Sequence, residues 1–139
     1  MFDKRYDDRL TEWRKFRDSL EESDDPFSAV ISFYSKAPYV SLYTDPYDET
    51  RWPTPWELLE ENQYCDFNTV LGMCYSLQLT ERFKGSVFEI HIVTSKEKAE
   101  TVYFLVVDNV AVFDNNYMAV SDLPQDFVVQ KKYTMPNIH

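Results

Sequence analysis

The chain has 139 residues, a net charge of −10 and an aromatic content of 17%. A chain of this length buries about two-thirds of its unfolded surface as one domain, and this aromatic content argues against disorder. No apolar run reaches the roughly 20 residues that span a bilayer, so we expect a soluble intracellular protein with no membrane partner. The excess of acidic side chains also argues against direct binding to nucleic acid, whose affinity depends on Lys and Arg.

The first third of the chain predicts two helices. Residues 7–22 place apolar side chains at spacings of three and four, which indicates an amphipathic helix whose buried face holds Leu10, Trp13, Phe16 and Leu20. Asp25 before Pro26 predicts the N-cap and first position of a second helix, which ends by Pro38. We therefore divide a single domain, 1–139, into an N-terminal helical region, 1–38, and a helix-plus-sheet core, 39–139.

The middle of the chain predicts an irregular segment followed by two more helices. Residues 39–52 contain turn-forming prolines, with a short strand expected over 40–43. Thr54-Pro55-Trp56-Glu57 is a capping box with proline at the first helical position, and it predicts a helix to about residue 62. A longer helix then runs to about residue 80. Gly72 lies inside it and indicates either the close approach of another element, such as a strand, or simple tolerance.

The second half of the chain changes to the period of β-strands. In residues 86–93, Phe88, Ile90 and Ile92 alternate with Glu89 and His91, which predicts a half-buried strand with His91 on its polar side. Residues 101–107 are continuously apolar, as in a central strand, and a turn at 108–109 leads into a strand over 110–113. Residues 127–133 predict the last strand. The expected fold is α+β, with N-terminal helices packed on a C-terminal antiparallel sheet of about four strands.

Cys65 is the residue whose position points most directly to chemistry. It lies at the expected start of the long helix, where the helix dipole stabilises a thiolate. A nucleophilic cysteine also needs a base, and His91 and His139 are the only histidines. With two cysteines and two histidines at unsuitable spacings, we expect no metal site and no cofactor.

The order of these elements resembles the transglutaminase-like branch of the papain-type fold over about residues 52–115. The matching residues are Trp52, Pro55, Leu59, Tyr64-Cys65-Asp66 and Phe113-Asp114-Asn115. The resemblance implies Cys65 as nucleophile, a histidine leading the strand at 101–107, and Asp114 ending the next strand. Thr101-Val102-Tyr103 contains no histidine, and His91 lies one strand earlier. We therefore expect a scaffold whose active site has been lost, with Cys65, His91 and Asp114 as the only catalytic candidates.

A second resemblance covers most of the chain. The residues from Pro55 to Cys65, with 77–83, 88–92 and the opening 4–10, look like proteins of large contractile-tailed phages (myophages) that infect marine cyanobacteria. This resemblance implies a phage protein located in the virion, in the bacterial host cytoplasm, or in both. We predict a non-enzymatic virion or assembly component whose partners are other phage or host proteins. One alternative is a thiol enzyme that uses Cys65.

The irregular segment is the predicted contact surface, because Tyr and Trp are enriched where proteins meet. The aromatic residues that surround it are Tyr39, Tyr43, Tyr47, Trp52 and Trp56. A local core beneath the segment is an equal alternative for these side chains. Residues 1–66 also carry 16 acidic and 8 basic side chains. That imbalance allows a further alternative function, an acidic inhibitor of a host nucleic-acid-binding protein.

Overall fold

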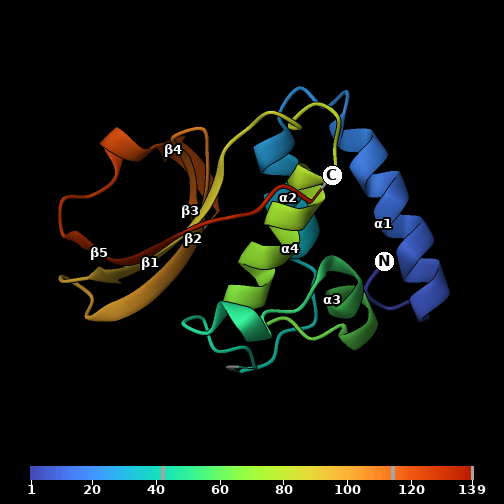
Figure 1. Ribbon diagram of the computed structural model, residues 1–139, viewed down its shortest axis with the longest axis horizontal. Helices are drawn as coiled ribbons and strands as arrows, with labels where there is room; N and C mark the ends of the chain where they lie inside the picture. Colours follow the sequence, from blue (N-terminus) through green and yellow to red (C-terminus); the bar gives the residue numbers. More distant parts are fainter. Residues whose placement is uncertain (42, 114, 139) are drawn as a thin grey trace.

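A helical layer packs against one face of an antiparallel sheet in the computed structural model, which describes residues 1–41, 43–113 and 115–138 (Figure 1). The helices are α1 (Tyr6–Leu20), α2 (Pro26–Tyr34), α3 (Pro55–Glu61) and α4 (Asp66–Gln78), with a short 3₁₀ turn, η1 (Glu49–Arg51), before α3. The strands are β1 (Phe88–Ser95), β2 (Glu100–Val107), β3 (Val110–Phe113), β4 (Asn116–Ala119) and β5 (Phe127–Thr134), with η2 (Val120–Asp122) after β4. The predicted α+β class is confirmed.

The helix starts follow the capping signals in the sequence. The Asp25 side chain accepts a hydrogen bond from the Ser28 amide, and Pro26 is the first residue of α2. At α3 both halves of the capping box form, because Thr54 and Glu57 each accept from the other's amide at 3.2 and 3.1 Å. Both predicted N-caps are therefore confirmed.

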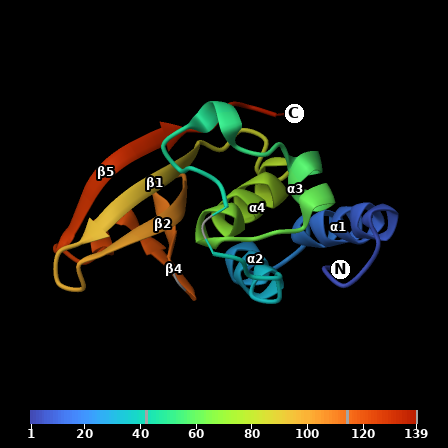
Figure 2. The same cartoon turned by 90° about the horizontal axis from the view of Figure 1, so that it is seen from below.

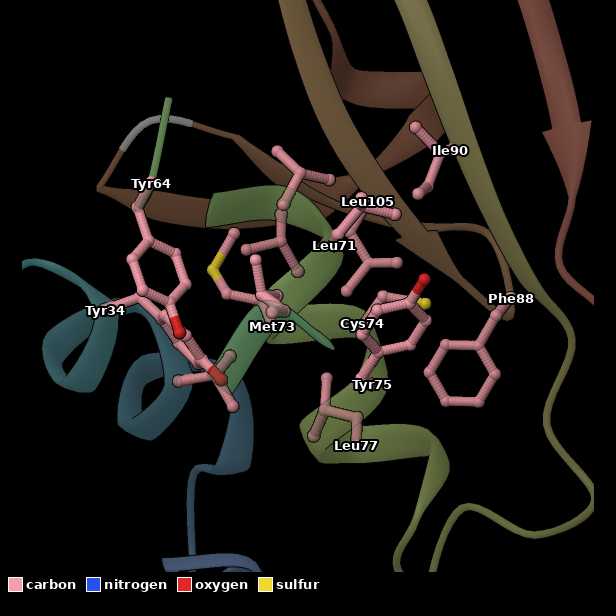
Figure 3. Packing of buried hydrophobic residues seen from close by; sticks show 14 of the residues in the cluster. Tyr34, Tyr64, Leu71, Met73, Cys74, Tyr75, Leu77, Phe88, Ile90 and Leu105 are labelled. Atoms are coloured by element: carbon pink, nitrogen blue, oxygen red, sulfur yellow. The ribbon is translucent and has the colours of Figure 1, made fainter. Parts of the chain in front are cut away.

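Helix α4 is the centre of the molecule. It packs on β1 and β2 on one side and on α1, α2 and α3 on the others (Figures 1 and 2). Figure 3 shows Tyr34 and Tyr64 on one side of α4, and Phe88, Ile90 and Leu105 of the sheet on the other. The sequence predicted one buried face, whereas nearly every residue from Phe67 to Gln78 is buried. A helix enclosed by other elements has no solvent face, so periodicity understates its burial.

The sheet has five strands in the order β4-β3-β2-β1-β5, all antiparallel. The predicted central strand is confirmed as β2, which lies in the middle. Asp108 and Asn109, with φ of 48° and 68°, form the two-residue turn between β2 and β3. The estimate of about four strands missed β4, whose four residues carry no alternating apolar pattern.

One further expectation is corrected. Outside the undescribed Leu42, residues 40–43 form no strand, and this segment makes only an isolated bridge between Tyr39 and Tyr64. The close approach of another element at Gly72 is confirmed, and that element is α2, through the ring of Tyr34. Within the described residues, no helix is both long enough and apolar enough to cross a membrane.

Candidate functional site

Cys65 lies where the sequence placed it, at the N-cap of α4. A left-handed turn at Asn62, with φ of 52°, ends α3 and returns the chain to start α4. The Cys65 carbonyl accepts hydrogen bonds from the amide and hydroxyl of Thr69, at 3.0 and 3.2 Å. Its side chain makes no capping hydrogen bond, and the residue is 3% exposed. The thiol therefore lies at the positive end of the helix dipole but has very little access to solvent.

Tyr103 of β2 is the sheet residue that faces this end of α4. Its ring packs edge-on against Phe67, with the ring centroids 5.4 Å apart. Burial raises the pKa of the Tyr103 hydroxyl, and Tyr47, Cys65 and Asp66 are near enough to raise it further. The resemblance implies a histidine at the start of this strand, and the residue of this part of β2 that packs on the start of α4 is instead a tyrosine. Thr101-Val102-Tyr103 shows the absence of histidine in the sequence, whereas the packing of Tyr103 on α4 depends on the fold.

His91 lies on the other face of the sheet. It pairs with Phe104 across β1 and β2, its ring lies 5.6 Å from the Phe104 ring, and both belong to the side that carries Val93. Cys65 instead belongs to the core on the opposite face of the sheet. Ile90, which precedes His91 in β1, belongs to that same core. Because successive side chains of a strand point to opposite faces, the sheet separates His91 from Cys65.

The environment of His91 also corrects its predicted exposure. The residue is 3% exposed, because the connection from β4 to β5 covers this face of the sheet. Its Nε2 lies 3.4 Å from the Glu89 carboxylate. Burial lowers the pKa of His91, while Glu89 opposes that shift. Asp114, the third catalytic candidate, lies outside the described residues.

A cleft lies between α4 and β2, and Cys65 is not among the described residues that line it. Its volume is about 310 Å³. Asp66, Thr69, Val70 and Met73 line it from α4; Glu100, Thr101, Val102 and Tyr103 from β2; and Val112 from β3. Asp66 and Glu100 are exposed, whereas Val70, Met73 and Val112 are buried. We call this feature the α4–β2 cleft. Glu100 carried no sequence signal, because its place at the cleft depends on how β2 pairs with its neighbours.

Four of the five aromatic residues predicted as a contact surface are exposed. The exposed fractions are 70% for Tyr39, 50% for Tyr43, 57% for Tyr47 and 50% for Trp56. Trp52 is half-buried between Phe67 and Tyr133, with ring centroids 5.0 and 4.8 Å away. We call Tyr39, Tyr43, Tyr47 and Trp56 the aromatic surface, while Trp52 helps to hold the segment on α4.

Comparison by sequence finds no matching protein family and no matching curated protein. Comparison by structure finds a calcium-bound structure of LapG from Legionella pneumophila, with a TM-score of 0.66 and 16% identity over 91% of this chain and 74% of LapG. A second LapG structure gives the same TM-score and identity over 92% and 75%. The fold is therefore transglutaminase-like. At this identity the likeness concerns the fold alone.

Within the described ranges, no three side chains of His, Cys, Asp or Glu gather where they could hold a metal ion. Cys65 and Cys74 are both buried free thiols, and burial raises the pKa of Cys74. The reactive groups at the start of α4 are thus the Cys65 thiol and the Asp66 carboxylate, with the Tyr103 phenol on the facing strand.

Proposed function

We propose that this protein is a transglutaminase-like scaffold that acts through protein–protein contacts and not through its thiol. The observation that carries the proposal is that His91, the one histidine among the described residues, lies on the face of the sheet opposite the core that contains Cys65. A phenol of raised pKa is a poor proton acceptor at neutral pH, and nucleophilic cysteines depend on a nearby base.

The aromatic surface supports the contact role. Large aromatic side chains that remain half exposed or more in a folded chain are typical of residues that meet a partner. Acidic residues accompany them, because residues 39–66 hold seven carboxylates and a single basic side chain, Arg51. Aromatic rings and negative charge together favour a partner surface that carries positive charge.

The proposal also names the biological context of these contacts. The sequence resemblance to phage proteins is its sole support, and it leads us to propose a role in the virion or in its assembly, with phage or host proteins as partners. The acidic side chains equally support inhibition of a host nucleic-acid-binding protein. Association with purified particles would favour the first role. A host protein released from this chain by rising salt would favour the second.

The proposal is tested by purifying tagged chains from infected cells and identifying the proteins that accompany them. We expect Cys65→Ser to retain the partners of the wild type and the double variant Tyr39→Ala/Tyr47→Ala to lose them. Val87→Ala/Val129→Ala is the matched control, because these valines are the exposed large apolar residues outside the aromatic surface. Urea unfolding of each variant shows whether the fold is intact. Full retention of the partners by the tyrosine variant would contradict the proposal.

A thiol enzyme is the second candidate, and one observation favours it. Cys65 begins α4 in a transglutaminase-like fold, at the position where a helix dipole stabilises a thiolate. If this candidate were correct, Cys65→Ser would abolish a biological effect that the tyrosine variant retains. Cys65→Ser and Tyr39→Ala/Tyr47→Ala therefore give opposite results for the two candidates. A contact role is lost only in the tyrosine variant, and an enzymatic role only in Cys65→Ser.

A further inference from the structure

The sheet has one long edge, which is formed by β5. Within the described residues, the order β4-β3-β2-β1-β5 leaves the outer sides of β4 and β5 without a neighbouring strand. β4 has only four residues, and its Tyr117 is held against α2 by a hydrogen bond to Asp25 at 2.9 Å and by contact with the Phe27 ring. β5 has eight residues and forms the outer border of the sheet, as Figure 2 shows. An edge strand of this length can pair with a strand of another protein.

The pairing of β5 with β1 identifies the backbone groups that point outward. The Met135 amide donates to the Phe88 carbonyl at 2.8 Å, in continuation of the β1–β5 register. Because hydrogen-bonded pairs alternate along an antiparallel ladder, Tyr133 bonds to β1, whereas Lys132 and Thr134 direct their N–H and C=O groups to the free edge. Within the described part of the chain, no other element supplies a hydrogen-bond partner for these outward groups.

β5 is also a basic segment of an acidic protein. Residues 127–139 contain Lys131 and Lys132 and no acidic residue, whereas all 24 acidic side chains lie earlier in the chain. Both lysines are exposed, and neither belongs to an ion pair among the described residues. Lys131 lies over the Tyr133 ring, with Nζ 5.3 Å from the ring centroid. Glu89, the acidic residue of the neighbouring strand β1, contacts the buried imidazole instead. The two ammonium groups are therefore open to carboxylates of a partner.

We propose that the free edge of β5 pairs with an extended segment of a partner protein that carries two consecutive acidic residues. The backbone of this segment bonds to the outward groups of Lys132 and Thr134. Lys131 and Lys132 are successive residues of β5, so their side chains stand on opposite faces of the sheet. Successive side chains of an added strand alternate in the same way. Two adjacent carboxylates of the segment therefore meet both lysines.

A second copy of this chain is a poor occupant of the same edge. Pairing of β5 with itself brings Lys131 and Lys132 against the lysines of the other copy, and like charges opposite each other destabilise paired strands. Lysine on an edge strand is a known device against such self-pairing. Charge thus selects an acidic segment and rejects a basic one. Because β5 shares no residue with the aromatic surface, this inference goes beyond the proposed function.

The test uses acetylated, amidated hexapeptides and the ¹⁵N-labelled protein. Thr-Val-Glu-Glu-Val-Thr is the acidic strand, Thr-Val-Lys-Lys-Val-Thr reverses its charge, and Gly-Pro-Glu-Glu-Pro-Gly keeps the charge but disfavours a strand. We expect only the acidic strand to slow hydrogen exchange at the Lys132 and Thr134 amides, by at least about twofold once half of the protein is bound. The Tyr133 amide, which already bonds to β1, should change far less.

Three results of the peptide experiment would overturn the proposal. The first is no slowing at Lys132 and Thr134 at millimolar concentrations of the acidic strand. The second is an equal effect of the glycine–proline peptide, which would show attraction by charge without strand pairing. The third is slowing that depends on protein concentration and not on peptide, which would show that the edge pairs with a second copy.

Variants of β5 separate this edge from general electrostatic attraction. Lys131→Gln/Lys132→Gln should weaken binding of the acidic strand about threefold to tenfold, as expected for the loss of two exposed ion pairs. Lys15→Gln/Lys36→Gln removes the same charge from exposed positions of the helical region and should leave binding within error. Equal weakening by the two double variants would overturn the site.

A backbone variant tests the strand pairing itself. Thr134→Pro removes an outward amide and no bond to β1, so it should weaken the acidic strand although both lysines remain. Urea unfolding shows whether the proline variant keeps its fold. If it does and binds the peptide as tightly as the wild type, the pairing is contradicted. If it does not, the lysine variants and the exchange of Lys132 decide.

Failure of this inference can be told from failure of the proposed function. Tyr39→Ala/Tyr47→Ala should bind the acidic strand as the wild type does, because neither tyrosine belongs to β5. If no peptide binds while the tyrosine variant loses the natural partner, contacts remain the function and β5 is not one of their sites. If Cys65→Ser abolishes the biological effect, the proposed function fails whatever the peptides do.

Discussion

The ring of Tyr34 occupies the space that a side chain at Gly72 would need. A Cβ atom placed at position 72 would lie 2.5 Å from Cε1 and 2.8 Å from Cζ of Tyr34. The ring cannot easily withdraw, because its hydroxyl is hydrogen-bonded to Ser76 at 2.9 Å and its edges contact Phe2 and Phe33. This contact joins α2 to the centre of α4, the helix that positions Cys65.

We predict that Gly72→Ala destabilises the protein by up to about 2 kcal/mol. Overpacking of a filled core costs about 1–3 kcal/mol, and the roughly 1 kcal/mol that alanine contributes to helix propensity offsets part of that cost. The midpoint of urea unfolding measures the change. Gly85→Ala is the control, because nothing lies within 4 Å of a Cβ at that position. A Gly72→Ala variant more stable than the wild type would show that Tyr34 moves freely.

Arg9 joins α1 to the end of α3 without a carboxylate partner. Its guanidinium is largely buried and donates hydrogen bonds to the carbonyls of Leu59 at 2.9 Å and Glu60 at 3.1 Å. Arg9→Met leaves these carbonyls unpaired, so we expect a loss of about 1–3 kcal/mol in unfolding free energy. Arg14→Met, at an exposed position of α1, should change stability by less than about 0.5 kcal/mol. Similar values for the two variants would contradict the role given to Arg9.

The buried imidazole of His91 predicts how stability depends on pH. Burial holds the pKa of His91 below its ordinary value in the folded state, although the nearby Glu89 carboxylate partly opposes the shift. The unfolded chain therefore binds more protons as pH falls below about 6.5, and the free energy of unfolding decreases in that direction. His91→Phe should flatten this part of the profile. Chemical denaturation between pH 5 and 8 provides the test, and an unchanged slope in the variant would refute it.

The sequence predicted the helix starts more accurately than the surroundings of the candidate site residues. Local signals such as the Thr54 capping box act over a few residues and survive in any fold, so they can be read directly. The burial of His91 depends on the β4–β5 connection, which crosses the sheet from a distant part of the chain. Alternation along one strand cannot report such a cover. The place of Glu100 at the α4–β2 cleft likewise depends on strand pairing, which the residues of β2 alone do not show.

Replacing Tyr103 by histidine introduces an imidazole on the strand that faces the start of α4. We predict that Tyr103→His places an imidazole beside Cys65 and raises its rate of alkylation by iodoacetamide at pH 7 by at least about tenfold, since a neighbouring imidazolium favours the thiolate. Tyr103→Phe is the control, because it removes the hydroxyl without adding a base. Equal rates in both variants would show that position 103 does not face the thiol.

The most direct test of the non-catalytic proposal is the alkylation rate of Cys65 in the unmodified chain, measured by mass spectrometry at pH 7 against free glutathione. Cys65→Ser identifies any signal that comes from Cys74. Because Cys65 is 3% exposed and His91 lies on the opposite face of the sheet, we predict a rate no higher than that of glutathione. A rate orders of magnitude above glutathione would reveal an activated nucleophile and contradict the proposal.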